Sequence, residues 1–234
     1  MTLTTAQKHA IDCVLSIFET GRVPTAASYA TCTILADGAG ISYGKHQCTD
    51  RAGSLDLVVK RYIAKGGKFA TELKACESLL ASNASTKENP KGPYTAPVAG
   101  LMNLLKQAGA DPVMHAAQDE VFDENYFAPA LNHAASVGAA HPLTVLVIYD
   151  TCIHSGPGGV TIIRNKFASK SPANGGDEKE WVKAYINARR AWLAGNANPL
   201  VQKTVYRMDA LMELVNANNW ELVLPFKLRG VVVS

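Results

Sequence analysis

Apolar residues recur at helical spacing along most of the chain. The clearest case lies between residues 5 and 19, where one face carries Ala10, Ile11, Val14, Leu15 and Phe18. Thr4 or Thr5 supplies an N-cap for this helix and Gly21 a stop. The same spacing predicts further helices over residues 54–64, 68–81, 97–107, 112–127, 142–154, 178–194 and 200–217.

A different pattern between residues 29 and 48 predicts a small β-hairpin or sheet. Residues 29–35 are rich in threonine and apolar side chains, residues 37–40 (DGAG) have turn chemistry, and residues 41–43 form a returning strand. Residues 143–149 are ambiguous, because valine and isoleucine favour a strand, but the preceding Pro142 fits the first turn of a buried helix. We therefore expect a mainly α, lysozyme-like α+β fold.

The length suits one large domain or two lobes that share a cleft. Residues 82–97 contain asparagine, serine, glycine and three prolines, which predicts a loop and a candidate hinge between two helical lobes. We expect residues 1–234 to form a single catalytic domain with the small antiparallel sheet beside the cleft. No separate wall-binding domain is predicted, and the molecule is expected to be a monomer.

Composition and charge exclude several classes of protein. The chain is 47% hydrophobic and 18% charged, and it contains no apolar run of about 18 residues that would insert into a membrane. The formal net charge of +3 is compatible with an anionic polymer but too weak to imply nucleic acid. Residues 1–8 lack the features of a secretory signal, so we expect synthesis in the cytoplasm and action on the cell wall or periplasm after release through a pore or injection.

The five cysteines match no zinc or redox spacing, and buried free thiols explain them best. No cluster of histidine, cysteine and aspartate has metal-ligand spacing, so neither a metal nor another cofactor is expected. A nucleophilic pair of Cys48 and His46 has no supporting context.

Two carboxylates are candidates for acid–base chemistry. Glu19 ends the first helix four residues after Leu15, beside the apolar face, where a carboxyl is disfavoured as an anion and suited to be a general acid. Asp37 lies in the predicted turn 18 residues later. Each residue alone is more easily explained as a solvated helix end or an ordinary turn aspartate. A pair of carboxyls on opposite walls of a groove is what a glycosidase needs.

Asp150 and His154 lie in or after the most apolar segment. A buried carboxylate must be paired or protonated, and Arg189, Arg190 and Arg207 are candidate partners, so a structural ion-pair network is favoured over catalysis. His154 begins a glycine-rich loop that lacks a phosphate-loop signature, and it is better explained as a structural residue at the helix end than as a base.

Taken together, these segments resemble the glycoside hydrolase family 46 chitosanases and their lysozyme-like relatives that cleave peptidoglycan. The similar segments occur in the same order and comprise residues 16–20 (SIFET), 36–42 (ADGAGIS), 117–119, 126–130, 149–151, 154–158, 175–178 and 188–191. The resemblance implies an inverting enzyme in which Glu19 protonates the glycosidic oxygen, Asp37 activates water and Ser42 positions that water. It also implies a charge network of Asp150, Arg189 and Arg207 behind the acid, and substrate contacts from Tyr43, Ser54 and His154.

Two departures from the family pattern bear on the substrate. Family chitosanases usually carry arginine where this chain has Ala39, and an acidic residue that binds the sugar amine where it has Ser54. Asp56 lies two residues away and is an alternative partner for the amine. Our first hypothesis is therefore a muramidase-like phage endolysin that cuts β-1,4 bonds of peptidoglycan. The alternatives are a chitosanase on the same scaffold and a non-catalytic wall-binding protein.

Overall fold

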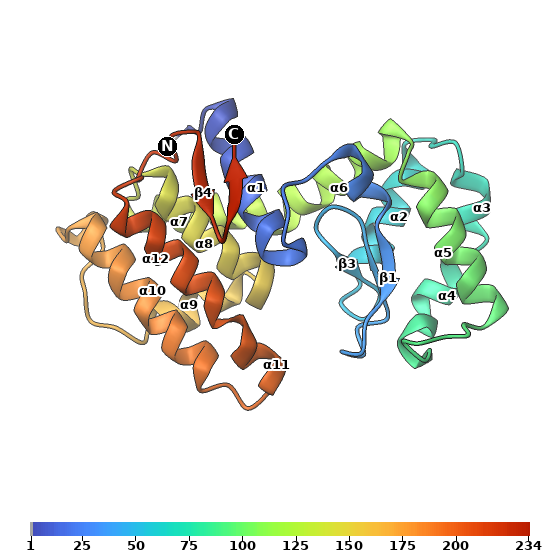
Figure 1. Ribbon diagram of the computed structural model, residues 1–234. Coiled ribbons are helices and arrows are strands. Elements are labelled where there is room, and N and C mark those ends of the chain that lie inside the picture. The colour runs from blue at the N-terminus through green and yellow to red at the C-terminus, as the bar shows by residue number, and fades with distance from the viewer. Residues whose placement is uncertain (1) are drawn as a thin grey trace. The chain divides into compact units, whose positions relative to one another are not determined.

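The computed structural model describes residues 2–234 and is mostly helical with two small antiparallel sheets (Figure 1). The chain forms two compact units: unit 1 consists of the segment that ends at Val23 together with Glu124–Ser234, and unit 2 is Pro24–Asp123. The expected mainly helical, lysozyme-like fold class is confirmed. Residues 82–97, the expected hinge, lie inside unit 2. A composition rich in turn formers indicates a loop, but it does not show how the helices on either side of that loop pack.

Unit 1 is a helical assembly closed by a C-terminal hairpin. Its longer helices are α1 (Thr5–Thr20), α7 (Ala128–Val137), α8 (Pro142–Ser155), α9 (Gly158–Arg164), α10 (Glu178–Ala194) and α12 (Tyr206–Asn216). Short turns η4 (Pro172–Asn174), α11 (Pro199–Gln202) and η5 (Lys203–Val205) connect them, and the hairpin pairs β4 (Phe226–Leu228) with β5 (Val231–Val233). The core includes the buried aromatic side chains of Trp181, Tyr185 and Tyr149.

Helix α8 is buried over most of its length. Residues 143–149 are helical, as Pro142 at the first turn indicates, and every side chain from Pro142 to Cys152 is buried. A helix that is apolar on all sides can be stable only when other elements surround it, and α7, α9, α1 and α10 all contact α8. Anything polar on α8 must therefore find its partner inside unit 1.

Unit 2 combines a three-stranded sheet with helices. The antiparallel strands are β1 (Cys32–Ile34), β2 (Ile41–Tyr43) and β3 (Cys48–Thr49), with Ile34 opposite Ile41 and Ser42 opposite Thr49. The helical elements are η1 (Ala26–Ala30), α2 (Ser54–Ala64), α3 (Ala70–Lys74), α4 (Glu77–Ala81), η2 (Ala84–Lys87), α5 (Ala96–Ala108) and α6 (Pro112–Phe122). Helix α6 stops at Phe122, where a π-helical turn, η3 (Asp123–Phe127), replaces the predicted continuation.

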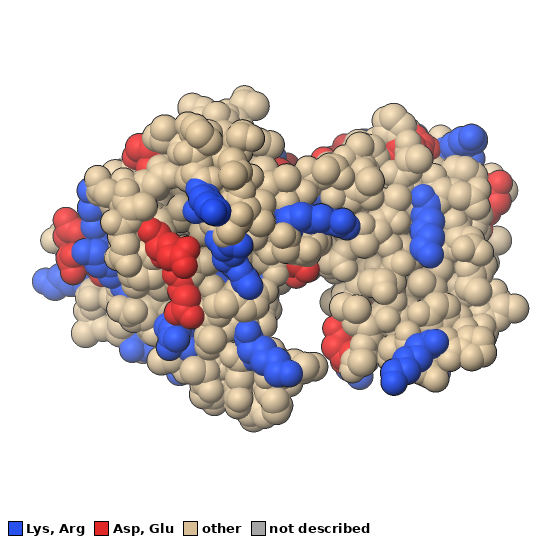
Figure 2. Space-filling view, in the orientation of Figure 1, with Lys and Arg blue, Asp and Glu red and all other residues tan. Residues whose placement is uncertain are grey.

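The cysteines and the charged surface agree with a globular chain of ordinary composition. None of the five cysteines forms a disulfide, as predicted: Cys13, Cys48 and Cys152 are buried, and Cys32 and Cys76 are partly buried. On the face drawn in Figure 2, acidic and basic side chains lie scattered between larger areas of neutral surface. Within residues 2–234, no helix is long and apolar enough to cross a membrane, and no three metal-binding side chains form a cluster.

Candidate active site

Glu19 lies in the last turn of α1, and two helix-end signals define that helix. A capping box starts it: the Thr4 hydroxyl accepts a hydrogen bond from the Gln7 backbone at 3.2 Å, and the Gln7 side chain accepts one from the Thr4 backbone at 2.9 Å. Gly21 ends the helix in the left-handed conformation at φ 75°. The buried face of α1 thus places the Glu19 carboxyl at the rim of the core, with 25% of the side chain exposed.

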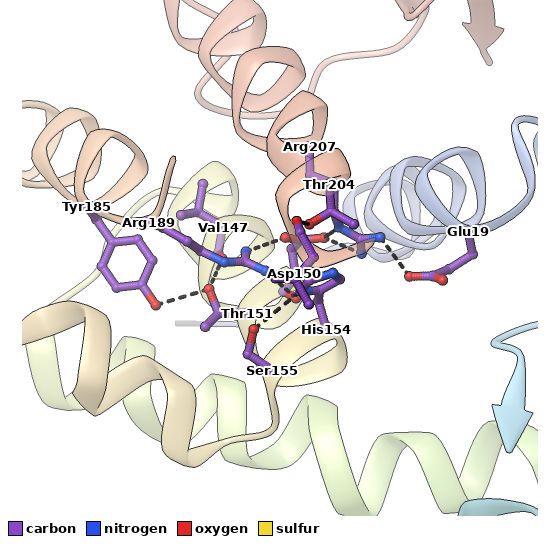
Figure 3. Close-up of polar contacts among 11 residues, drawn as sticks. Glu19, Val147, Asp150, Thr151, His154, Ser155, Tyr185, Arg189, Thr204 and Arg207 are labelled. Carbon is purple, nitrogen blue, oxygen red and sulfur yellow. Dashed lines mark hydrogen bonds and ion pairs between the residues drawn. The ribbon is translucent and has the colours of Figure 1, made fainter. Parts of the chain in front are cut away.

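Arg207 on α12 connects Glu19 to the interior of unit 1. Its guanidinium donates from Nη1 to Glu19 Oε1 at 2.8 Å, and from Nε and Nη2 to Asp150 Oδ1 at 2.9 and 2.6 Å. Only 2% of the Arg207 side chain is exposed. Figure 3 shows the guanidinium between the two carboxyls. One edge of the planar group binds Asp150, and the nitrogen on the other side, Nη1, binds Glu19.

Asp150 on α8 is fully buried and paired with two arginines. Arg189 on α10 donates to its carboxylate and, at 3.3 Å, to its backbone carbonyl. Burial alone would raise the pKa of Asp150, but the positive charges of Arg207 and Arg189 lower it to about 2. Arg190, the third arginine that the sequence suggested, instead pairs with Asp209 at the surface. Removing one member would leave an uncompensated buried charge, which typically costs about 3–5 kcal/mol.

His154 lies at the end of α8 next to this network. Its Nδ1 lies 3.3 Å from the Ser155 hydroxyl (Figure 3). Thr151, which lies one turn before His154 on α8, accepts a hydrogen bond at Oγ1 from the Tyr185 hydroxyl at 3.0 Å. Burial and the positive charge of Arg207 lower the pKa of His154 to about 4, against the opposing effect of Asp150. The ring is therefore neutral at pH 7, which fits the structural role expected at the helix end. The predicted substrate contact of His154 stays a prediction.

Asp37 lies in the exposed turn between β1 and β2 of unit 2. Its Oδ1 accepts a hydrogen bond from the Ala39 backbone at 2.9 Å, which is the usual way in which an aspartate stabilises a tight turn. Gly38 and Gly40 flank Ala39 with φ angles of 73° and 74°, which other residues rarely adopt. The turn thus presents a solvated carboxylate on a backbone that its own glycines constrain.

The strand after this turn carries Ser42 and Tyr43. Ser42 is buried in the middle strand of the sheet, five residues from Asp37. Tyr43 has no exposed surface, and its hydroxyl donates to the Leu105 carbonyl at 2.8 Å. The structure therefore assigns Tyr43 to the core of unit 2, in place of the substrate contact expected from the sequence. All three residues of β2 are buried, so both faces of this strand are covered and no side chain of the strand is open to solvent.

Ser54 and Asp56 begin α2, and both are occupied by local contacts. The Ser54 hydroxyl accepts from the Thr49 backbone at 2.9 Å and donates to the Thr49 carbonyl at 3.4 Å, so it holds the corner between β3 and α2. Asp56 Oδ2 accepts from Lys60 Nζ at 2.7 Å, one turn along the helix. Ser54 supplies no carboxylate for a sugar amine, and Asp56 uses only Oδ2 for Lys60, since its buried Oδ1 has no hydrogen-bond partner among residues 2–234. The substrate contact of Ser54 also stays a prediction.

A nucleophilic cysteine is not supported by the geometry. Cys48 Sγ donates to the Tyr43 carbonyl at 3.1 Å, and burial raises the pKa of its thiol far above the usual range. His46 stacks on Phe122 with ring centroids 4.6 Å apart. The sequence-based rejection of a Cys48–His46 pair therefore agrees with the structure.

Two residues near the Asp37 turn escaped the sequence analysis. Asp50 follows β3 and is buried, with only 2% of its surface exposed, and it accepts two hydrogen bonds from Ser85 of η2. No motif marks either residue. A signal was present for Asp50 alone, because an acidic residue directly after a strand and before a glycine-containing turn is a candidate for hydrogen bonding to neighbouring backbone.

The structure brings Glu19, Arg207, Asp150 and Arg189 together within unit 1. In unit 2, Ser42 and Ser54 both adjoin Thr49, and Asp37 lies in the turn before the strand that carries Ser42. A partly exposed glutamate held at one oxygen by a buried arginine can give or take a proton at the other. A solvated turn aspartate can accept a proton from water. These are the two chemical capacities that hydrolysis of a glycosidic bond requires.

Comparisons with known proteins agree with this chemistry. The model for glycosyl hydrolase family 46 matches residues 13–226. A chitosanase from Bacillus subtilis (strain 168) is 30% identical over 237 residues, covering 96% of this chain and 82% of the relative. A chitosanase from Streptomyces sp. (strain N174) is 27% identical, with 92% and 76% covered.

Solved structures of chitosanases share the fold over almost the whole chain. The E19A mutant of a chitosanase from Bacillus subtilis MY002, complexed with 6 GlcN, superposes with a TM-score of 0.82 at 26% identity, covering 100% of both chains. A family 46 chitosanase from Gynuella sunshinyii in complex with chitotetraose gives 0.80 at 29% identity, with 99% of this chain and 98% of that chain covered. The chain described here belongs to glycosyl hydrolase family 46 and is a glycosidase.

Proposed function

We propose that this protein is a chitosanase, which hydrolyses β-1,4 bonds between glucosamine units of chitosan. The observation that carries the proposal is the match to family 46 over residues 13–226, with chitosanases as the similar proteins across nearly the full chain. Two of the similar solved structures are described with glucosamine oligomers or chitotetraose bound. The comparisons thus favour the alternative that the sequence left open over the peptidoglycan hypothesis, which they do not support.

The proposed mechanism uses Glu19 as the general acid and Asp37 as the general base. Glu19 would protonate the glycosidic oxygen while Arg207 holds its other oxygen in place. Asp37 would deprotonate a water that attacks the anomeric carbon from the opposite face, with Ser42 helping to position that water. Inversion of this kind requires the two carboxyls to stand roughly 6.5–9.5 Å apart.

An N-acetylated substrate is the second candidate, and the neutral Ser54 side chain at the start of α2 favours it. A glucosamine ammonium is best bound by a carboxylate, but Ser54 presents only a neutral hydroxyl. An acetylated sugar carries no charge at that position and needs no such partner. Peptidoglycan and partly acetylated chitosan are therefore the substrates against which chitosan should be compared.

Reducing-sugar release from chitosan, from chitosan of higher acetylation and from peptidoglycan tests the substrate. We expect cleavage of chitosan and products with the inverted anomeric configuration when they are followed by NMR during the first turnovers. Cleavage of peptidoglycan without cleavage of chitosan would overturn the proposal in favour of the second candidate.

Single substitutions test the two roles. Glu19→Gln and Asp37→Asn should each lower kcat by about 10²–10⁴-fold, because each removes a group that transfers a proton in the transition state. Glu213→Gln, at an exposed position of α12, is the matched control and should keep wild-type activity. Circular dichroism checks that the variants are folded. A folded Glu19→Gln or Asp37→Asn variant with wild-type kcat would refute that residue's assignment.

A further inference from the structure

The residue that follows the Asp37 turn, Ile41, is held by a buried hydrogen-bond relay through Ser85 to Asp50. Ile41, the first residue of β2, donates from its backbone to Ser85 Oγ at 2.8 Å. The same hydroxyl donates to Asp50 Oδ2 at 2.5 Å, and the Ser85 backbone donates to that oxygen at 3.2 Å. The relay therefore runs from a buried carboxylate through one hydroxyl to the backbone beside the turn.

Backbone contacts reinforce the same segment. Asp50 donates from its backbone to the Ile41 carbonyl at 3.1 Å, and Arg51 donates to the Ala39 carbonyl at 3.1 Å. Ile41 is thus gripped at its amide by Ser85 and at its carbonyl by Asp50. These contacts fix the two residues on either side of Gly40, only two to four residues after Asp37.

Ser85 also lies directly against Gly40. A Cβ at this position would come within 2.4 Å of Ser85 Oγ and 3.0 Å of the Thr86 backbone nitrogen. Real side chains essentially never approach so closely, so the turn can lie against η2 only because residue 40 is glycine. The turn and η2 are therefore in close contact.

Stability alone does not explain why Asp50 is an acid. Its Oδ1 is buried and has no hydrogen-bond partner among residues 2–234, and such an oxygen typically costs 1–3 kcal/mol or more. Burial raises the pKa of Asp50, against the lowering effect of Ser85. The Asp50 carboxyl is costly to bury, and it holds the backbone next to the turn of Asp37, the candidate base. A role in function explains it better than packing does.

We propose that Asp50 and Ser85 are positioning residues, which hold the Asp37 turn in the geometry required for activation of water. The proposal rests on the proposed role of Asp37 as general base. Both residues are buried, so they would act through the backbone of the turn. Loss of the relay should let the turn relax, and a displacement of about 1 Å in a reacting group can lower the rate by roughly 10²-fold.

Kinetics of Ser85→Ala and Asp50→Asn test this role. Both variants should lower kcat by about 10- to 100-fold while KM changes less than about threefold, because the turn is displaced but the sugar contacts remain. The double variant should lose no more activity than the worse single variant, since the two residues act as one unit. Ser85→Ala leaves the Asp50 carboxylate in place, and it decides the question if Asp50→Asn does not fold.

Tyr62→Phe is the matched control. It removes another buried hydroxyl of unit 2, which donates to Asp111 at 2.7 Å and accepts from Phe69 at 3.0 Å, and neither partner belongs to the Asp37 turn or to η2. This variant should lower the Tm yet keep wild-type kcat. An equal loss of kcat in Tyr62→Phe and Ser85→Ala would show a general effect of destabilisation and overturn the proposal.

Two further readouts separate this proposal from the proposed function. Hydrogen exchange of the amides at residues 39–42 should become faster in Ser85→Ala and not in Tyr62→Phe, whatever the substrate proves to be. If the wild type is active and the Asp37→Asn variant is not, Asp37 is established as the general base. If that condition is met, wild-type kcat in a folded Ser85→Ala variant overturns the positioning role and leaves the proposed function intact.

Discussion

At the scale of single residues, Arg207 links two carboxylates of unit 1, Asp150 and Glu19. Its guanidinium bonds to a fully buried carboxylate and to a partly exposed one, and these contacts raise its already high pKa despite burial. Such a cation keeps its charge at any pH at which the protein is folded. Glu19 is therefore held by a partner that does not titrate, and its orientation does not depend on the protonation of Arg207.

The neutral state of His154 predicts a specific pH dependence of stability. Because the pKa of His154 is about 4 in the folded protein and about 6.5 in an unfolded chain, the unfolded chain binds more protons between these values. The free energy of unfolding should fall by up to about 3 kcal/mol as the pH decreases from about 6.5 to about 4. Urea denaturation at several pH values measures this fall.

His154→Gln should make the curve flatter in that window only. The contribution of Asp150 is lost at lower pH, between 3.8 and about 2, because its pKa is lowered by folding. The two effects are therefore separable by pH. Parallel curves for the variant and the wild type between pH 4 and 6.5 would show that the ring does not carry the effect.

From the residues alone, Asp150 needed a partner and three arginines were open, whereas the resemblance to family 46 implied the observed pair, Arg189 and Arg207. The pattern on α10 could have distinguished two of them. Arg189 follows Tyr185 by four residues and precedes Leu193 by four, so it lies on the buried face, whereas Arg190 is turned away from it. Burial cost predicts that a charge is paired, and helical periodicity then predicts which neighbour is the partner.

At the scale of elements, prediction succeeded where periodicity and end signals agreed. Helices α1, α8 and α10 were expected within one residue of their observed bounds, since each has a cap or a proline at its start. The predicted helix over 200–217 is divided into α11, η5 and α12, although no glycine or proline interrupts it. The Ala-rich α7, the short α9 and the C-terminal hairpin were not predicted.

The hairpin shows why some elements escape prediction. Its strands have only three residues each, and Arg229 and Gly230 connect them with φ angles of 49° and 84°. Two residues with positive φ between apolar runs are typical of a tight hairpin turn, but arginine rarely occupies the first position. The pattern was therefore present without the Asn-Gly or Asp-Gly pair that usually identifies it.

Adjacent valines of β5 test how much the hairpin contributes to unit 1. Val233 is fully buried in the core, whereas its neighbour Val232 is 58% exposed. Val233→Ala should lower the free energy of unfolding by about 2 kcal/mol, because it removes buried apolar surface and leaves a cavity. Val232→Ala, the matched control, should change it by less than about 0.5 kcal/mol. Equal effects in urea denaturation would contradict the buried position of Val233.

At the scale of the whole molecule, the two units differ in how the chain builds them. Unit 2 is the continuous segment Pro24–Asp123, and it has a core of its own that includes Leu55, Tyr62, Leu105 and Met114. Its length is typical of a small domain. Unit 1, in contrast, needs segments from both sides of unit 2, because α1 packs with helices that follow residue 124.

We therefore expect a fragment of residues 24–123 to fold by itself. Circular dichroism should show helical structure that is lost in a single cooperative transition on heating. Leu105→Ala in the same fragment should lower the free energy of unfolding by about 2–5 kcal/mol, since that side chain is fully buried. A fragment without a cooperative transition would show that unit 2 depends on the rest of the chain.

The interrupted course of unit 1 has a consequence for biosynthesis. The ribosome makes α1 first, yet α8, α10 and α12, which complete its surroundings, emerge only after the whole of Pro24–Asp123 has been made. At about 5–20 residues per second, the apolar face of α1 waits several seconds for its partners. During that interval the apolar face of α1 is exposed on the nascent chain, while the segment after it can already be folded. This is the stage at which we expect a chaperone to bind the nascent chain.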